Sequence, residues 1–138
     1  MTTWTAAQQR EAARSAYNAE LADCPGHQVL AILSGKWATL VVEALVDGPH
    51  RHAELAARVA GATQKMLTQT LRALERDGLV DRTVIAGVPP RVDYRLTALG
   101  EEFFALQRQV RDWADRHAGA IAAARGEHDR AGGRVSES

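Results

Sequence analysis

The segment over residues 63–97 constrains the fold of this chain more than any other part. Thr63 is a typical helix N-cap, and it precedes a helical apolar repeat that predicts a helix over Gln64–Asp77. The apolar stripe of that helix consists of Leu67, Leu71 and Leu74. Alternating residues then predict a hairpin over 79–97, with strands 79–86 and 91–97 around the tip Gly87-Val88-Pro89-Pro90. A helix with one polar face therefore leads directly into a two-stranded hairpin.

The polar face of this helix carries Gln64, Lys65, Thr68, Gln69 and Arg72. A polar helix followed by a basic hairpin is typical of a winged helix-turn-helix, which places the helix in the major groove of DNA and the hairpin against the backbone. A solvated helix surface is the alternative interpretation. The expected base contacts are, in order, Gln69, Thr68 and Gln64, because such side chains can bond base edges. Lys65 and Arg72 are expected to lie closer to phosphates.

Other basic residues are candidates for the same interface. Arg91 follows a rigid Pro-Pro tip, which suits a cation held near a phosphate or in the minor groove. Lys36 could reach a phosphate from the earlier helices. For both residues, an ordinary surface charge is the alternative. Two more arginines either flank Arg91 or form cross-strand pairs, namely Arg82 with Asp93 and Arg95 with Asp81.

Composition limits the function classes without choosing among them. The chain has 138 residues, of which 46% are hydrophobic, so one compact domain is expected. The formal net charge is +0, which is unusual for a nucleic-acid-binding chain. Residues 64–95 hold only a small local surplus of basic side chains. Non-specific affinity for DNA should therefore be modest and sensitive to salt.

Several other classes of site and location find no support in the sequence. No run of about 18 apolar residues predicts a membrane span, and the first residues do not resemble a secretory signal. The single cysteine, Cys24, excludes an intrachain disulfide and fits a reducing cytoplasm. The histidines have no spacing that completes a metal site, and no phosphate loop or catalytic elbow is present. We therefore expect no metal, no cofactor and no enzyme activity.

The rest of the chain is predicted to be mainly helical, so the fold class is mainly α with a small β-hairpin. Expected helices cover 5–22, 25–33, 36–46 and 51–59, and a long helix follows Thr97. We divide the chain into an N-terminal helical extension (1–23), a winged domain (24–125) and a tail (126–138). The tail lacks any apolar repeat and is expected to be disordered.

The first and last helices have apolar faces that a small winged core cannot fully cover. A second subunit could cover them, and a two-fold dimer suits a DNA site with two half-sites. The aromatic residues of the last helix, Phe103, Phe104 and Trp113, fit packing or dimer contacts, with an effector pocket as the alternative. Trp37 lies on the apolar face of its helix and is expected in the core.

Several short motifs of the chain resemble those of a known protein family. They include Gly35-Lys36-Trp37, Asp47-Gly48-Pro49, Lys65-Met66-Leu67-Thr68-Gln69, Asp77-Gly78-Leu79-Val80, and Val88-Pro89-Pro90-Arg91-Val92-Asp93-Tyr94-Arg95-Leu96-Thr97. Together with Cys24-Pro25, this pattern is similar to the HxlR-type winged helix-turn-helix regulators of bacteria, over roughly residues 24–110. The resemblance implies a dimeric, cytoplasmic, DNA-binding transcription regulator whose terminal helices dimerise.

Cys24 has two open interpretations. It directly precedes Pro25, which is expected to start a helix, and the positive end of a helix stabilises a thiolate. The resemblance implies that the matching cysteine senses oxidants in redox-responsive members of the family. The alternative is a small residue kept for packing. A small apolar effector near the dimer helices is the other candidate signal.

We therefore expect a homodimer that reads a near-palindromic DNA site with helix 64–77 and wing 79–97. It would respond to an oxidant or electrophile at Cys24, or to a small molecule. A winged-helix module that binds a protein or a ligand without binding DNA is the alternative.

Overall fold

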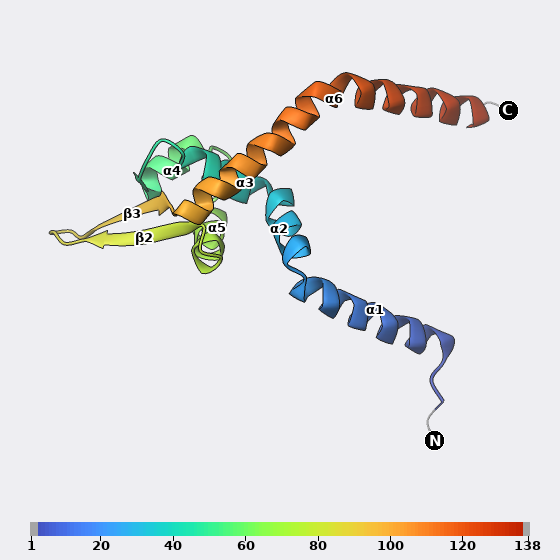
Figure 1. Cartoon of the computed structure of the whole chain (residues 1–138), viewed down its shortest axis with the longest axis horizontal. Helices are drawn as coiled ribbons and strands as arrows, with labels where there is room; N and C mark the ends of the chain where they lie inside the picture. Colours follow the sequence, from blue (N-terminus) through green and yellow to red (C-terminus); the bar gives the residue numbers. More distant parts are fainter. Residues whose placement is uncertain (1–2, 137–138) are drawn as a thin grey trace.

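The computed structural model describes residues 3–136, which form a small winged core with a long helix projecting from each end of the chain (Figure 1). The elements in chain order are α1 (Ala6–Asp23), α2 (Pro25–Ser34), α3 (Lys36–Ala44), β1 (His50–Arg51), α4 (His52–Arg58), α5 (Gln64–Arg76), β2 (Val80–Ile85), β3 (Arg91–Leu96) and α6 (Ala98–Ser136). The predicted class, mainly α with a small β-hairpin in a winged helix-turn-helix, is confirmed.

The core lies where α3, α4, α5 and the start of α6 meet. The three predicted leucines of α5 are all buried there, together with Leu55 of α4 and Phe103 of α6. Trp37 is half-buried against the same cluster, as its apolar position predicted. Burying one such leucine contributes about 1.5–3 kcal/mol. The apolar face of α5 is therefore fixed to the core, and its opposite face is left toward solvent.

Local capping signals place the ends of the helices. Thr63 Oγ1 accepts a hydrogen bond from the Met66 amide at 3.1 Å, as expected for the N-cap of α5. Gly78 follows with φ of 77°, a left-handed conformation that glycine adopts without steric cost. Thr97 Oγ1 accepts from the Gly100 amide at 3.0 Å and caps α6. These caps fix where α5 ends and where the wing begins.

The wing contains one strand more than the hairpin that was predicted. β1 pairs antiparallel with β3, so the sheet order is β1-β3-β2. The register sets Asp81 opposite Arg95, and these two residues form the predicted ion pair at 3.6 Å. The predicted pair of Arg82 with Asp93 is wrong, because the register places Tyr94 opposite Arg82. A pair of residues on opposite faces of a sheet cannot meet directly.

The C-terminal part of the chain corrects another prediction. We expected disorder over 126–138, but α6 continues as a helix to Ser136, and residues 137–138 lie outside the described residues. The lack of an apolar repeat shows only that this segment has no buried face. A helix that has already formed can still be extended, because each added residue contributes one backbone hydrogen bond. With 39 residues, α6 is about 58 Å long. Within residues 3–136, no helix is both long and apolar enough to cross a membrane.

Candidate nucleic-acid interface

The solvent-facing side of α5 carries polar side chains, most of which have no partner among the described residues. Gln64, Lys65, Gln69 and Arg72 are all exposed. Within residues 3–136, no hydrogen bond or ion pair engages any of these four side chains. The leucine stripe holds the other side of the helix in the core. Four of the five predicted residues therefore present free donors and acceptors on this face.

Thr68 belongs to the same face but differs from its neighbours. It is half-buried, and its Oγ1 lies 3.1 Å from His52 Nε2 at the start of α4. His52 is itself half-buried. This contact joins residues 16 positions apart in the chain, and nothing in the local sequence pattern indicates it.

The wing beside α5 supplies two arginines in different states. Arg91 Nε donates to Asp93 Oδ1 at 2.8 Å, and this partner raises the pKa of Arg91. Because guanidinium has five N–H donors, four remain available after this bond. Arg82 is exposed, and within the described residues no polar partner engages it. Arg82 is therefore an unpaired cation on the wing, although the sequence pattern favours Arg91 over it as a candidate for DNA contact.

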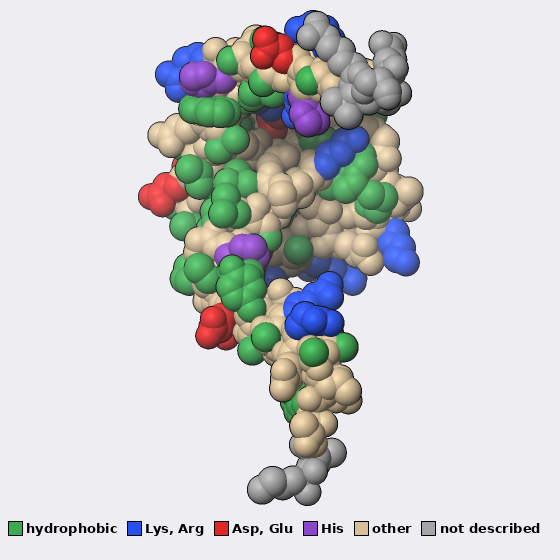
Figure 2. All heavy atoms as spheres, turned by 90° about the vertical axis from the view of Figure 1, so that its right-hand side faces the viewer, with side chains coloured by type: hydrophobic (Ala, Val, Ile, Leu, Met, Phe, Trp, Pro, Cys, Tyr) green, Lys and Arg blue, Asp and Glu red, His purple; other side chains and the backbone are tan. Residues whose placement is uncertain are grey.

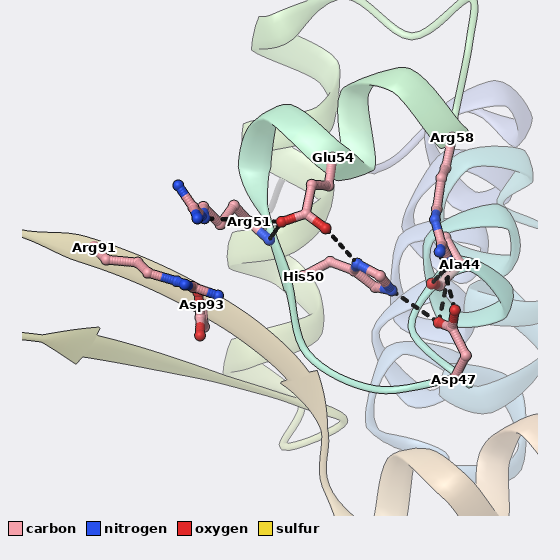
Figure 3. A network of polar contacts seen from close by, with 8 residues as sticks. All are labelled: Ala44, Asp47, His50, Arg51, Glu54, Arg58, Arg91 and Asp93. Atoms are coloured by element: carbon pink, nitrogen blue, oxygen red, sulfur yellow. Dashed lines mark hydrogen bonds and ion pairs between the residues drawn. The ribbon is translucent and has the colours of Figure 1, made fainter.

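A polar network joins the turn after α3 to α4 at the base of the wing (Figure 3). His50 Nε2 lies 2.8 Å from Asp47 Oδ1, and its Nδ1 lies 2.9 Å from Glu54 Oε2. Arg58 also bonds Asp47, at 2.9 Å, and donates to the Ala44 carbonyl. Hydrogen bonds to the carboxylates of Glu54 and Asp47 raise the pKa of His50. Hydrogen bonds from Arg58 and His50 hold the pKa of Asp47 well below its ordinary value.

This network fixes the position of α4 and β1 relative to α3. The backbone amide of Arg51 also bonds Glu54 Oε1, at 3.4 Å, which ties β1 to the first turn of α4. Because β1 pairs with β3, the network also anchors the wing. No local sequence pattern indicates this network, since His50, Asp47 and Glu54 come together only when the turn closes.

Lys36 does not lie beside the exposed polar side chains of α5. Its Nζ lies 4.9 Å from the ring centroid of Trp37. Both residues line an open groove of about 960 Å³ between α2, α3, α5 and α6. The groove meets α5 on a different side from the predicted DNA-reading face, at Thr70, Ala73, Leu74, Arg76 and Asp77.

Cys24 lies between α1 and α2 as a free, exposed thiol. It is the C-cap of one helix and the N-cap of the next, and its side chain makes no capping hydrogen bond. The start of α2 at Pro25 agrees with the sequence prediction. Elsewhere in residues 3–136, no cluster of His, Cys, Asp or Glu side chains is arranged to hold a metal ion.

The fold and this polar face agree with what known proteins show. A family model described as HxlR-like helix-turn-helix matches residues 32–122. The chain belongs to the HxlR-like family. The matched range covers α3, the polar network, α5, the wing and most of α6, and α1 lies outside it.

Proteins similar to this HxlR-like chain include regulators with solved structures. It is 38% identical over 104 residues to YtfH of Escherichia coli (strain K12), an uncharacterized HTH-type transcriptional regulator, over 75% of this chain and 82% of that protein. The structure of ytfH from Salmonella typhimurium has a TM-score of 0.63 at 38% identity, covering 75% and 93% of the two chains. The redox regulator HypR in its reduced form has a TM-score of 0.65 at 33% identity, covering 72% and 99%. The HxlR-like protein is therefore a helix-turn-helix transcription regulator and not an enzyme.

Proposed function

We propose that this protein is a homodimeric regulator that binds a near-palindromic DNA site through α5 and the wing. The observation that carries the proposal is the free polar face of α5, where Gln64, Lys65, Gln69 and Arg72 have no partner within residues 3–136. An exposed face of donors and acceptors on a rigidly packed helix suits the major groove. Such a regulator would act in the cytoplasm, where bacterial DNA lies.

The wing fits the phosphate backbone in this proposal. Arg82 offers an unpaired guanidinium, and Arg91 is oriented by Asp93, whose side chain is only 14% exposed. Phosphate contacts of this kind position a protein on the duplex and add a salt-dependent contribution to affinity. Lys36 lies by the groove on another side of α5, so we assign it a lesser role, as a phosphate contact of a flanking DNA segment.

The two long terminal helices support dimerisation. None of the α1 residues is buried, and Tyr17 on that helix is 61% exposed. On α6, Leu99, Leu106, Val110 and Trp113 are exposed at successive spacings of seven, four and three residues, which place them on one side of the helix. Figure 2 shows hydrophobic side chains over the side toward which these helices project. A second copy of the chain would cover them, and each copy would then place one α5 on one half-site.

Two candidate signals fit the structure. Cys24 is an exposed thiol between α1 and α2, and the similar protein HypR is a redox regulator. Since the chain has one cysteine, a disulfide between cysteines of this protein would join two subunits. The groove of about 960 Å³ favours the second candidate, a small apolar effector that contacts the rear of α5.

DNA binding is tested by fluorescence anisotropy with the DNA beside the protein's own gene and with a scrambled duplex. The wild type should bind the first duplex at least about tenfold more tightly. Gln69→Ala should reduce that ratio, whereas Gln109→Ala on α6 should not. Equal binding to both duplexes, and to further genomic fragments, would favour the interaction module without DNA binding.

The thiol signal is tested with the same duplex after treatment with the disulfide-forming oxidant diamide. If Cys24 is the sensor, oxidation changes the affinity of the wild type and leaves Cys24→Ser unchanged. Non-reducing electrophoresis then shows a covalent dimer for the wild type alone. An affinity that is indifferent to diamide would remove Cys24 as the signal and turn the search to ligands of the groove.

A further inference from the structure

We propose that His52 is a positioning residue for DNA specificity, because it holds the Thr68 hydroxyl in the orientation that reads a base. This inference rests on the proposed DNA-binding function and extends it to a residue on α4. Its basis is the 3.1 Å contact between His52 Nε2 and Thr68 Oγ1 across the two helices of the helix-turn-helix.

The neighbouring Thr70 shows what a threonine hydroxyl does on this helix without such a partner. Thr70 Oγ1 donates to the Met66 carbonyl four residues earlier, at 2.7 Å. This bond is common for threonine inside helices, and it consumes the only hydroxyl proton. Thr68 makes no such bond within the described residues; its hydroxyl is directed to His52 instead. His52 therefore keeps Thr68 out of the backbone-bonded arrangement.

His52 stands on a rigid support. It is the first residue of α4, directly after β1, which pairs with the wing strand β3. Glu54, two residues on, is held by His50 at 2.9 Å and by the Arg51 amide. A side chain that orients a binding group needs this kind of support, because a loosely held partner would not select one rotamer.

The chemistry of the contact determines what Thr68 offers to DNA. A hydroxyl has one proton and two lone pairs, and imidazole Nε2 carries either a proton or a lone pair. When His52 Nε2 donates, the Thr68 proton is free for a base acceptor such as guanine N7 or O6, or thymine O4. In that geometry the Thr68 methyl group is also fixed. Thr68 then discriminates between base pairs rather than only filling space.

The experiment measures affinities for a panel of duplexes that carry single base-pair changes across the site beside the protein's own gene. The variants are His52→Phe, which removes the hydrogen bond, His52→Gln, whose amide can replace Nε2, and Thr68→Val, which removes the hydroxyl. We expect His52→Phe to lose about five- to tenfold discrimination at one base pair per half-site and to keep it elsewhere. Thr68→Val should lose discrimination at the same base pair, the double variant should lose no more, and His52→Gln should retain it.

Two results would overturn the inference. If His52→Phe weakens all duplexes equally or discriminates like the wild type, while the wild type reads the site, His52 has no positioning role and the proposed function stands. If the wild type itself discriminates no duplex, both the inference and the proposed function fail. Thr68→Val provides the test independently if His52→Phe does not fold, because wild-type discrimination by Thr68→Val also contradicts the proposal.

Discussion

His50 lies between two carboxylates that come from different segments of the chain. Asp47 belongs to the turn after α3 and Glu54 to α4, and each bonds one ring nitrogen of His50 (Figure 3). Both nitrogens can donate at once only in the protonated imidazolium. The His50 side chain is only 11% exposed, so solvent offers it little alternative. A charged His50 therefore joins the turn, β1 and α4.

This arrangement predicts how stability depends on pH. The folded pKa of His50 is raised above its ordinary value of 6.5, so its contribution is fully present below that pH and is lost as the pH rises through the folded value. We expect thermal stability to fall above about pH 6.5 in the wild type, and to fall less in His50→Gln. His27→Gln, which changes an exposed histidine of α2, is the control. A wild type and His50→Gln with parallel pH profiles would contradict this role.

The wing arginines predict the salt dependence of DNA binding. Arg82→Ala and Arg91→Ala should each weaken binding to all sequences and reduce the slope of log affinity against log salt by about 1 per subunit. Arg14→Ala, on exposed α1, is a matched loss of charge away from the wing and should leave the slope unchanged. An unchanged slope for Arg82→Ala or Arg91→Ala would remove that residue from the phosphate contacts.

The junction between α6 and the wing depends on a glycine. A Cβ on Gly100 would lie 2.1 Å from the Leu79 carbonyl oxygen, a backbone atom that cannot move aside. Gly100→Ala should therefore lower the free energy of unfolding by about 1–3 kcal/mol or more. Gly119→Ala, in the same helix with open space around it, should instead raise it by about 0.5–1 kcal/mol. Denaturant titration measures both, and equal effects would contradict the close contact at Gly100.

Elements with local signals could be predicted from the sequence, and those made by long-range contacts could not. The cap at Thr63, the leucine stripe and the turn at Gly78 together defined α5 within one residue at its C-terminal end. β1 has only two residues and exists because β3 pairs with it. No local repeat can indicate such a strand.

The candidate interface follows the same rule. The exposed set on α5 could be predicted because helical spacing alone separates it from the leucines. The partner of Thr68 could not, since it depends on how α4 packs against α5. Arg91 and Asp93 lie two residues apart on one face of β3, so strand alternation could have indicated their ion pair, but Asp93 was paired with Arg82 instead. The prediction of a disordered tail was wrong. It relied on the absence of an apolar repeat, but an established helix can continue without being buried.

The molecule as a single chain leaves both terminal helices largely uncovered, which predicts a dimer. Sedimentation should show two subunits at micromolar concentration, and Trp113→Glu should give monomers because it places a charge on an apolar seam of α6. Arg108→Gln makes the same change of charge on the opposite, exposed side of this helix and should remain dimeric. A monomeric wild type, or a dimeric Trp113→Glu with unchanged affinity, would contradict this interface.

The role of α5 as the DNA-reading helix is best tested by a footprint of the protein on the DNA beside its own gene, with methylation protection of guanine N7 in the major groove. A dimer that uses two copies of α5 should protect two patches about 34 Å apart on one side of the duplex. Gln69→Ala combined with Arg72→Ala should abolish both patches while the protein stays folded. A bound complex without major-groove protection, or with protection that survives these changes, would show that α5 is not the reading helix.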